Sequence, residues 1–228
     1  KGGGRAPEAA YHRCLALYEM QKPESLTQAR DELNRFLKDY PRHALAPKAR
    51  FYEALSAFDL KDHAGCEGSF EKVAAESPDL AGRALLRRGQ ALLLKDEPNA
   101  VAAADALAKA VEALEKDAAA PGADAALPQR IAEALYWKGE ALLAQDGKLL
   151  DAASAYGEVH KRFQPQSPEL AEKALYQMAR TLYLGGQHAQ GAEASDLYRK
   201  AYAADKGLFH AESERMPMSS PQPIEAST

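Results

Sequence analysis

The chain has 228 residues, a formal net charge of −4 and a sequence pI of about 5.9, which argues against the basic balance typical of nucleic-acid-binding modules. Alanine and leucine supply 48 and 28 residues, whereas valine, isoleucine and threonine supply only four, two and three. Helices favour Ala and Leu, and strands favour β-branched residues. The composition therefore predicts an all-α fold and excludes a β-sandwich, a barrel or a doubly wound α/β enzyme.

Apolar residues recur at helical spacing in ten segments, which come in pairs along the chain. The residue before a proline is driven out of the α region, so Tyr40-Pro41 and Ser77-Pro78 are expected to end helices. An Ala/Pro/Gly-rich linker is predicted at 118–128. The region 100–126 is short of large apolar side chains, so we expect it to bury little. In chain order, the predicted hairpins occupy residues 7–40, 44–77, 80–117, 129–164 and 169–205.

The two ends of the chain differ from the region between them. Residues 1–6 are glycine-rich and are predicted to be flexible, and 7–206 are predicted to form the folded array. Residues 207–228 are rich in Pro, Met and Ser, and we expect them to be disordered or bound to a partner. The chain begins without Met or an apolar leader, so it is interpreted as trimmed, with a lipid anchor upstream possible. No apolar run reaches the roughly 18 residues of a membrane span.

The first helices of the later hairpins repeat one motif. An anchoring alanine, followed five residues later by a small residue, recurs at intervals of 35, 50 and 40 residues, and the 50-residue interval contains the linker. The anchoring alanines are Ala49, Ala84, Ala134 and Ala174, and the small residues are Ala54, Gly89, Gly139 and Ala179. Self-similarity at this period is typical of stacked helical repeats, whose units each contact only their neighbours.

These residues resemble the tetratricopeptide repeat family, which pairs a small residue on the first helix with an aromatic residue on the second. Phe70, Tyr156 and Tyr198 occupy the aromatic position. The resemblance covers roughly 7–206 and implies a right-handed superhelical array of about five helical hairpins, a tetratricopeptide-like α-solenoid. The segment 36–41, Phe-Leu-Lys-Asp-Tyr-Pro, also resembles bacterial envelope repeat proteins of the outer-membrane assembly and Tol–Pal coordinator types.

The family resemblance also implies a concave groove that binds a peptide or protein partner through the first helices. Aromatic and arginine side chains are the residues that dominate such interfaces. The groove residues it implies are Lys48, Phe51, Tyr52, Arg83, Arg87, Gln90, Tyr136, Glu140, Lys173, Gln177, Arg180 and Tyr183. The alternative is that half of the aromatics pack between repeats, and since Tyr136 and Trp137 are neighbours on one helix, they cannot both point inward.

Three arginines lie within two turns of one predicted helix. Arg83 and Arg87 share a face at i, i+4 spacing and could clamp a carboxylate or phosphate, whereas Arg88 follows directly. The alternative is a solvated face, or pairing with Glu133 and Glu140 of the next hairpin. Both possibilities remain open at the level of the sequence.

Catalytic and metal-binding patterns are weak in this chain. His12, Cys14, His63 and Cys66 have the chemistry of zinc ligands, but they come from different hairpins and a tetrahedral site needs all four to converge. We expect buried cysteines without a disulfide, no metal and no cofactor. The sequence has no phosphate-binding glycine loop, no His-Glu-x-x-His and no Gly-x-Ser-x-Gly, so we expect no enzymatic activity.

The sequence therefore favours a non-catalytic scaffold that binds a protein or peptide partner in a larger bacterial assembly, without nucleic acid. The resemblance implies a periplasmic or outer-membrane-associated location, with the cytoplasm as the alternative. Two other functions remain open. One is a structural subunit that docks by its convex face or by residues 207–228, and the other is a regulatory domain cut from a larger enzyme.

Overall fold

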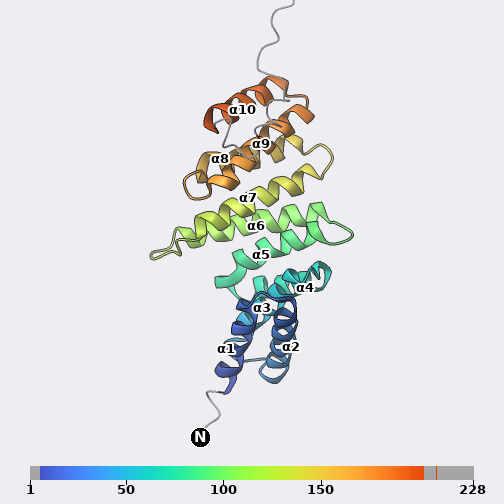
Figure 1. Ribbon diagram of the computed structural model, residues 1–228, viewed down its shortest axis with the longest axis vertical. Helices are drawn as coiled ribbons and strands as arrows, with labels where there is room; N and C mark the ends of the chain where they lie inside the picture. The colour runs from blue at the N-terminus through green and yellow to red at the C-terminus, as the bar shows by residue number, and fades with distance from the viewer. Residues whose placement is uncertain (1–5, 203–208, 210–228) are drawn as a thin grey trace, which may run out of the picture. The chain divides into compact units, whose positions relative to one another are not determined.

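The computed structural model describes residues 6–202 and 209, and this part of the chain contains ten α-helices and no strand. Within residues 6–118 and again within 127–201, each helix packs against the next along the chain (Figure 1), so the predicted all-α fold is confirmed. In chain order the helices are α1 (Ala6–Glu19), α2 (Pro23–Asp39), α3 (Ala46–Asp59), α4 (His63–Glu76), α5 (Pro78–Leu94), α6 (Ala100–Ala118), α7 (Leu127–Leu143), α8 (Leu149–Phe163), α9 (Pro168–Leu184) and α10 (His188–Ala201). None of them is long and apolar enough to cross a membrane.

Local sequence signals explain where these helices begin. Proline occupies the first turn of α2, α3, α5, α7 and α9, where its missing N–H would have had no intrahelical partner. Polar caps begin two others, because the side chains of Asp62 and Asn99 accept hydrogen bonds from the backbone N–H groups of Gly65 and Ala102 at 2.9 and 3.0 Å. Helix ends are therefore largely set by residues adjacent in sequence.

The predicted boundaries agree with the structure to within a few residues, with two differences at the ends. The last helix was expected to reach 205, but α10 ends at Ala201 and Tyr202 is extended. The first helix begins at Ala6, which the sequence placed in the flexible segment. The expectations for residues 1–5 and for the tail lie outside the described residues, apart from Phe209.

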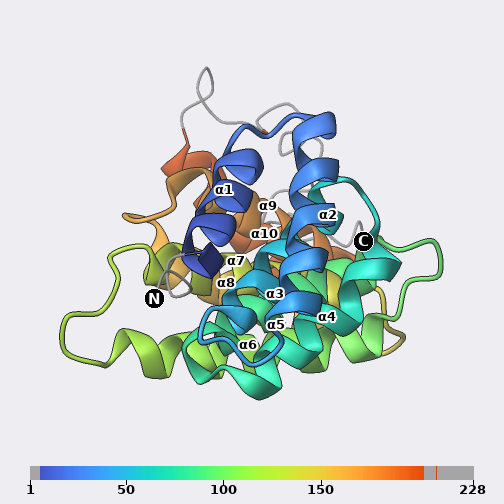
Figure 2. The same cartoon turned by 90° about the horizontal axis from the view of Figure 1, so that it is seen from below.

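The chain divides into two compact units, residues 1–121 and 122–228. The boundary falls inside the predicted linker, so the array expected as one body over 7–206 is described here as two units. Unit 1 contains α1 to α6 and unit 2 contains α7 to α10. Within unit 1, α1 and α2 lie side by side, as Figure 2 shows.

The expectation that 100–126 buries little is wrong. Helix α6 packs closely against α5 and buries residues at the spacing of one helical face. Alanine supplies half of this face, which lets the two helices approach closely. The buried residues are Ala103, Ala106, Leu107, Ala110, Val111 and Leu114.

The predicted small residues lie where the two helices of a hairpin touch. A Cβ atom added to Gly89 would lie 2.4 Å from Cγ of Leu107, and one added to Gly139 would lie 2.6 Å from Cε1 of Tyr156. Neither position has room for a larger side chain. The predicted pairing of a small residue with an aromatic one is therefore a steric contact between α7 and α8, and leucine takes the place of the aromatic ring between α5 and α6.

Candidate partner-binding surfaces

In unit 1, aromatic rings from α1 and α3 meet on the side formed by the first helices of the hairpins. The ring of Tyr52 lies edge-on to those of Tyr18, Phe51 and Tyr11, at centroid distances of 5.3, 5.9 and 6.5 Å. Such edge-to-face contacts are favourable because the ring edge is positive and the ring face negative. Tyr52 and Tyr18 are half-buried, so they hold the helices together and still reach the surface.

Two arginines of α5 lie over the aromatic rings of α3. The guanidinium carbon of Arg83 is 4.8 Å from the centroid of Phe51, and that of Arg87 is 5.7 Å from the centroid of Phe58. Arg87 also donates a hydrogen bond from Nη1 to Oε1 of Gln90 at 2.6 Å. Each ring therefore fixes a cation in place while its planar fork of donors remains half-exposed.

Arg83 differs from Arg87 in its surroundings. Arg83 makes no ion pair with any described residue, and its guanidinium lies over the Phe51 ring. A carboxylate brought by a partner would find a positioned guanidinium there. We define the unit 1 surface as Tyr18, Tyr52, Arg83 and Arg87.

A hydrogen bond between helices supports this surface from below. The Tyr18 hydroxyl donates to Oδ2 of Asp59 at 3.0 Å and thereby joins α1 to α3. Burial, followed by the charge of Asp59, raises the pKa of Tyr18 to about 12. The phenol therefore stays protonated, and remains a donor, throughout the physiological range.

Unit 2 carries a related arrangement on α7 and α9. The Nζ atom of Lys173 lies 4.7 Å from the centroid of the Tyr136 ring, and the Tyr156 hydroxyl donates to Oε1 of Glu140 at 2.9 Å. Burial, followed by the charge of Glu140, raises the pKa of both tyrosines. A cation of α9 thus covers a ring of α7, as a cation of α5 covers a ring of α3 in unit 1.

Phe209 lies over Tyr176 of α9. Its ring stacks on Tyr176 with centroids 4.6 Å apart and planes 13° apart, and its N–H donates to the Tyr198 hydroxyl at 2.8 Å. The same hydroxyl donates to Oε1 of the buried Glu172 at 2.7 Å. Phe209 therefore covers Tyr176 in the way that Lys173 covers Tyr136.

The structure divides the twelve predicted groove residues into three groups. Phe51, Gln90 and Tyr136 are buried, at 2%, 2% and 4% exposure, so the prediction that their side chains lie open to a partner is wrong. These three pack against neighbouring helices instead, as the alternative held for the aromatics. The half-buried members are Tyr52, Arg83, Arg87, Glu140, Gln177 and Tyr183, and the exposed ones are Lys48, Lys173 and Arg180.

Tyr183 lies apart from the rest of its group. Its ring faces Gly191 at the start of α10, where an added Cβ would lie 3.1 Å from the ring, and His188 is 5.9 Å away. It therefore packs between α9 and α10. Trp137 is half-buried next to the buried Tyr136, which agrees with the expectation that only one of the two points inward.

Sequence reasoning missed Tyr18 and Phe58 as members or supports of the unit 1 surface. Phe58 follows Phe51 by seven residues, two helical turns, and this spacing was a signal that it shares the same face. Tyr18 lies in the first hairpin, which is not among the hairpins whose first helices repeat the anchoring-alanine motif. Its role depends on Asp59, which is 41 residues away in the sequence.

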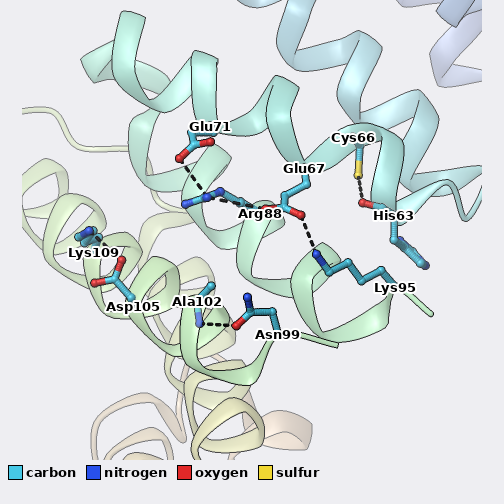
Figure 3. A network of polar contacts seen from close by, with 10 residues as sticks. All are labelled: His63, Cys66, Glu67, Glu71, Arg88, Lys95, Asn99, Ala102, Asp105 and Lys109. Carbon is cyan, nitrogen blue, oxygen red and sulfur yellow. Dashed lines mark hydrogen bonds and ion pairs between the residues drawn. The ribbon is translucent and has the colours of Figure 1, made fainter. Parts of the chain in front are cut away.

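Arg88 points away from the unit 1 surface, into a polar network between α4 and α5 (Figure 3). Its Nη2 atom lies 3.0 Å from Oε1 of Glu71 and 3.7 Å from Oε1 of Glu67, and Lys95 lies 3.0 Å from Oε2 of Glu67. We call these four residues the α4–α5 ion network. Arg83 and Arg87 therefore contact α3, whereas Arg88 contacts α4.

The two cysteines are buried and do not form a disulfide. Burial raises the pKa of Cys14 to about 11 and that of Cys66 to about 12, so both remain thiols at neutral pH. The Cys66 thiol donates to the backbone carbonyl of His63 at 3.4 Å. Within the described residues, no three His, Cys, Asp or Glu side chains are grouped to hold a metal ion.

The chain matches no model of a known protein family, and no curated protein is similar to it in sequence. The tetratricopeptide resemblance therefore stays a prediction carried by the residues quoted for it. What the structure contributes is the all-helical architecture and the positions of the side chains described above.

Proposed function

We propose that this protein is a non-catalytic scaffold of the tetratricopeptide type, which binds a segment of a partner protein on the unit 1 surface. The observation that carries the proposal is Arg83, a half-buried guanidinium held over Phe51 without an ion pair to any described residue. Beside it lie half-buried tyrosines. Arginine and tyrosine at a partly desolvated surface are the residues on which protein interfaces most depend.

The chemistry of the unit 1 surface specifies the kind of segment it would bind. Arg83 and Arg87 offer planar donors to a carboxylate, and Tyr52 offers a ring edge and a hydroxyl. A segment with acidic side chains next to an aromatic or aliphatic one would satisfy both. The location that we propose, in the bacterial periplasm or at the outer membrane, rests only on the resemblance of segment 36–41.

The test is a selection from a phage-displayed random peptide library with the wild-type chain, followed by affinity measurements on variants. We expect the selected peptides to be enriched in Asp or Glu, and to lose affinity by about tenfold or more with Arg83→Glu. Arg83→Met covers Phe51 without a charge, so it separates the loss of charge from the loss of packing.

Lys116→Glu is the matched control, because it makes the same charge change at an exposed position of α6. Peptides that bind Arg83→Glu and the wild type equally well would show that the unit 1 surface is not the binding site. Circular dichroism on each variant establishes that the helices are intact.

A further inference from the structure

Unit 2 has an apolar groove on the side formed by its second helices, away from the tyrosines and cations described above. Residues of α8, α9 and α10 enclose a space of about 740 Å³. Its floor is apolar and comes from α9, while α8 and α10 supply the walls. The lining residues that make the groove apolar are Leu150, Gly157, Met178, Leu182 and Leu197.

The corresponding place in unit 1 is closed by charged side chains. Helix α9 aligns with α5 without a gap, so Met178 stands where α5 has Arg88. Alignment of Tyr156 with Phe70, the aromatic residues of the second helices, places Ala153 at Glu67 and Gly157 at Glu71. Ala153, Gly157 and Met178 of unit 2 thus stand at the positions of Glu67, Glu71 and Arg88 of unit 1. Unit 2 therefore lacks three of the four residues of the α4–α5 ion network shown in Figure 3.

The groove leaves large apolar side chains in contact with water. Leu150 and Leu197, one on each wall, are 53% and 47% exposed. Placed on either side of an apolar floor, they form a continuous patch rather than the scattered single residues that protein surfaces normally carry. Replacing ion pairs with small residues at Ala153 and Gly157 is what leaves this floor uncovered.

Charge limits what can occupy the groove. Among the described residues that line it, the ionisable ones are His160 and Lys161, and because burial lowers the pKa of His160 below that of an ordinary histidine, the positive charge at neutral pH comes from Lys161. Lys161 is exposed and makes no ion pair with a described residue, whereas Glu158, one turn before it, pairs with Arg162. An occupant that brings a carboxylate to the groove would therefore pair with Lys161.

We propose that this groove is a second interaction surface, which binds the apolar face of an acidic amphipathic helix from a partner protein. One exposed leucine on each of two helices, Leu150 and Leu197, lies beside the apolar floor and fits apolar side chains at i, i+3, i+4 and i+7 of a bound helix, and Lys161 pairs with a carboxylate beside them. A fatty acid and a second copy of this chain are the other occupants that the experiment distinguishes from a helix.

The experiment uses two labelled 16-residue peptides with identical leucines at i, i+3, i+4 and i+7, one with glutamates and one with lysines on the polar face. Fluorescence anisotropy measures their affinity for the full chain. We expect the glutamate peptide to bind at least about tenfold more tightly than the lysine peptide. Lys161→Glu, at an exposed position, should abolish or reverse this preference.

A double variant tests the apolar floor without changing the net charge. Gly157→Glu with Met178→Arg introduces the counterparts of Glu71 and Arg88 of the α4–α5 ion network. We expect the double variant to lower the affinity for the glutamate peptide by at least about tenfold. The two changes belong together, because a Cβ on Gly157 would lie 3.0 Å from Sδ of Met178. Arg83→Glu should leave this binding unchanged, so failure here and failure of the proposed function can be told apart.

Four results would overturn the proposal. They are equal affinity for the two peptides, binding that both variants retain, binding of laurate without binding of either peptide, and a concentration-dependent dimer in sedimentation that the double variant abolishes. The third result would assign the groove to a fatty acid, and the fourth to a second copy of the chain.

Discussion

The surface between α4 and α5 in unit 1 and the surface between α8 and α9 in unit 2 are built from aligned helices but end in opposite chemistry. In unit 1, Arg88 reaches across to two glutamates of α4. In unit 2, methionine stands at the position of that arginine, and alanine and glycine stand at the positions of the glutamates. Three side chains thus decide whether the surface of a hairpin pair is closed by ion pairs or left open as an apolar groove.

The comparison shows which positions of the repeat carry structure and which are free to carry function. The contact between the two helices of a hairpin is tight in both units, at Gly89 against Leu107 and at Gly139 against Tyr156. The outer positions differ widely between the units. Stability is therefore set at the shared small residues, and specificity can vary around them. The predictions that follow run from the shared contact to the outer positions.

The largest effect is expected where the two units agree. Gly139→Leu places a side chain where the Tyr156 ring lies, and we expect the free energy of unfolding to fall by about 3 kcal/mol. Gly68→Ala is the control, because a Cβ there meets nothing within 4 Å, so it should stabilise α4 by up to about 1 kcal/mol. Urea unfolding followed by circular dichroism measures both, and equal effects would contradict the steric argument.

Alkaline pH should act on two tyrosines of unit 1 whose pKa is raised. Burial raises the pKa of Tyr11 and Tyr18 to about 12, against 10.0 for an ordinary tyrosine. Because the pKa is higher in the folded state than in the unfolded state, the protonated tyrosine contributes its full stabilisation below about pH 10. This contribution is lost as the pH rises from about 10 through 12. For the buried Tyr11 the loss is about 2 kcal/mol. Urea unfolding from pH 8 to 11.5 should show the decline, and Tyr11→Phe should make it shallower.

Unit 2 depends on a buried carboxylate that accepts from a tyrosine. Tyr198→Phe removes a donor to Glu172, and we expect a loss of about 1.5 kcal/mol because that carboxylate is only 6% exposed. Tyr40→Phe is a matched control on a half-buried tyrosine of unit 1. An unchanged unfolding midpoint for Tyr198→Phe would show that Glu172 finds another donor.

The smallest effect is expected from giving the α4–α5 ion network the methionine that unit 2 has at the position of Arg88. Arg88→Met removes the centre of the α4–α5 ion network and should cost about 1 kcal/mol, since Arg88 and Glu67 remain partly exposed, at 18% and 25%. The loss should shrink in 1 M salt, where the Debye length falls to about 3 Å. A loss that salt does not alter would mean that the aliphatic stem of Arg88, and not its charge, stabilises the hairpins.

Much of the helical architecture could be predicted because its causes lie close together in the sequence. Prolines, capping residues and the 3.6-residue period fix where a helix begins, ends and turns its apolar side, and these signals placed most helix ends within two residues. The pairing of a small residue on the first helix of a hairpin with an aromatic residue on the second also predicted the contact between Gly139 and Tyr156. The groove residues were predicted less well, because exposure depends on which helix packs on top.

Tertiary packing decided what the residues on one helix could not. Arg87 and Arg88 are neighbours in sequence, yet one lies over Phe58 of α3 and the other joins the α4–α5 ion network, because consecutive residues of α5 point about 100° apart and meet different helices. Phe51 and Tyr136 are buried because rings of the second helix of the same hairpin and cations of the following hairpin pack on them, Phe70 with Arg83 on one and Tyr156 with Lys173 on the other. The sequence by itself determined the helices, whose hydrogen bonds join residues four apart. The structure decided which surfaces remain open, since burial results from contacts between residues that are far apart in the chain.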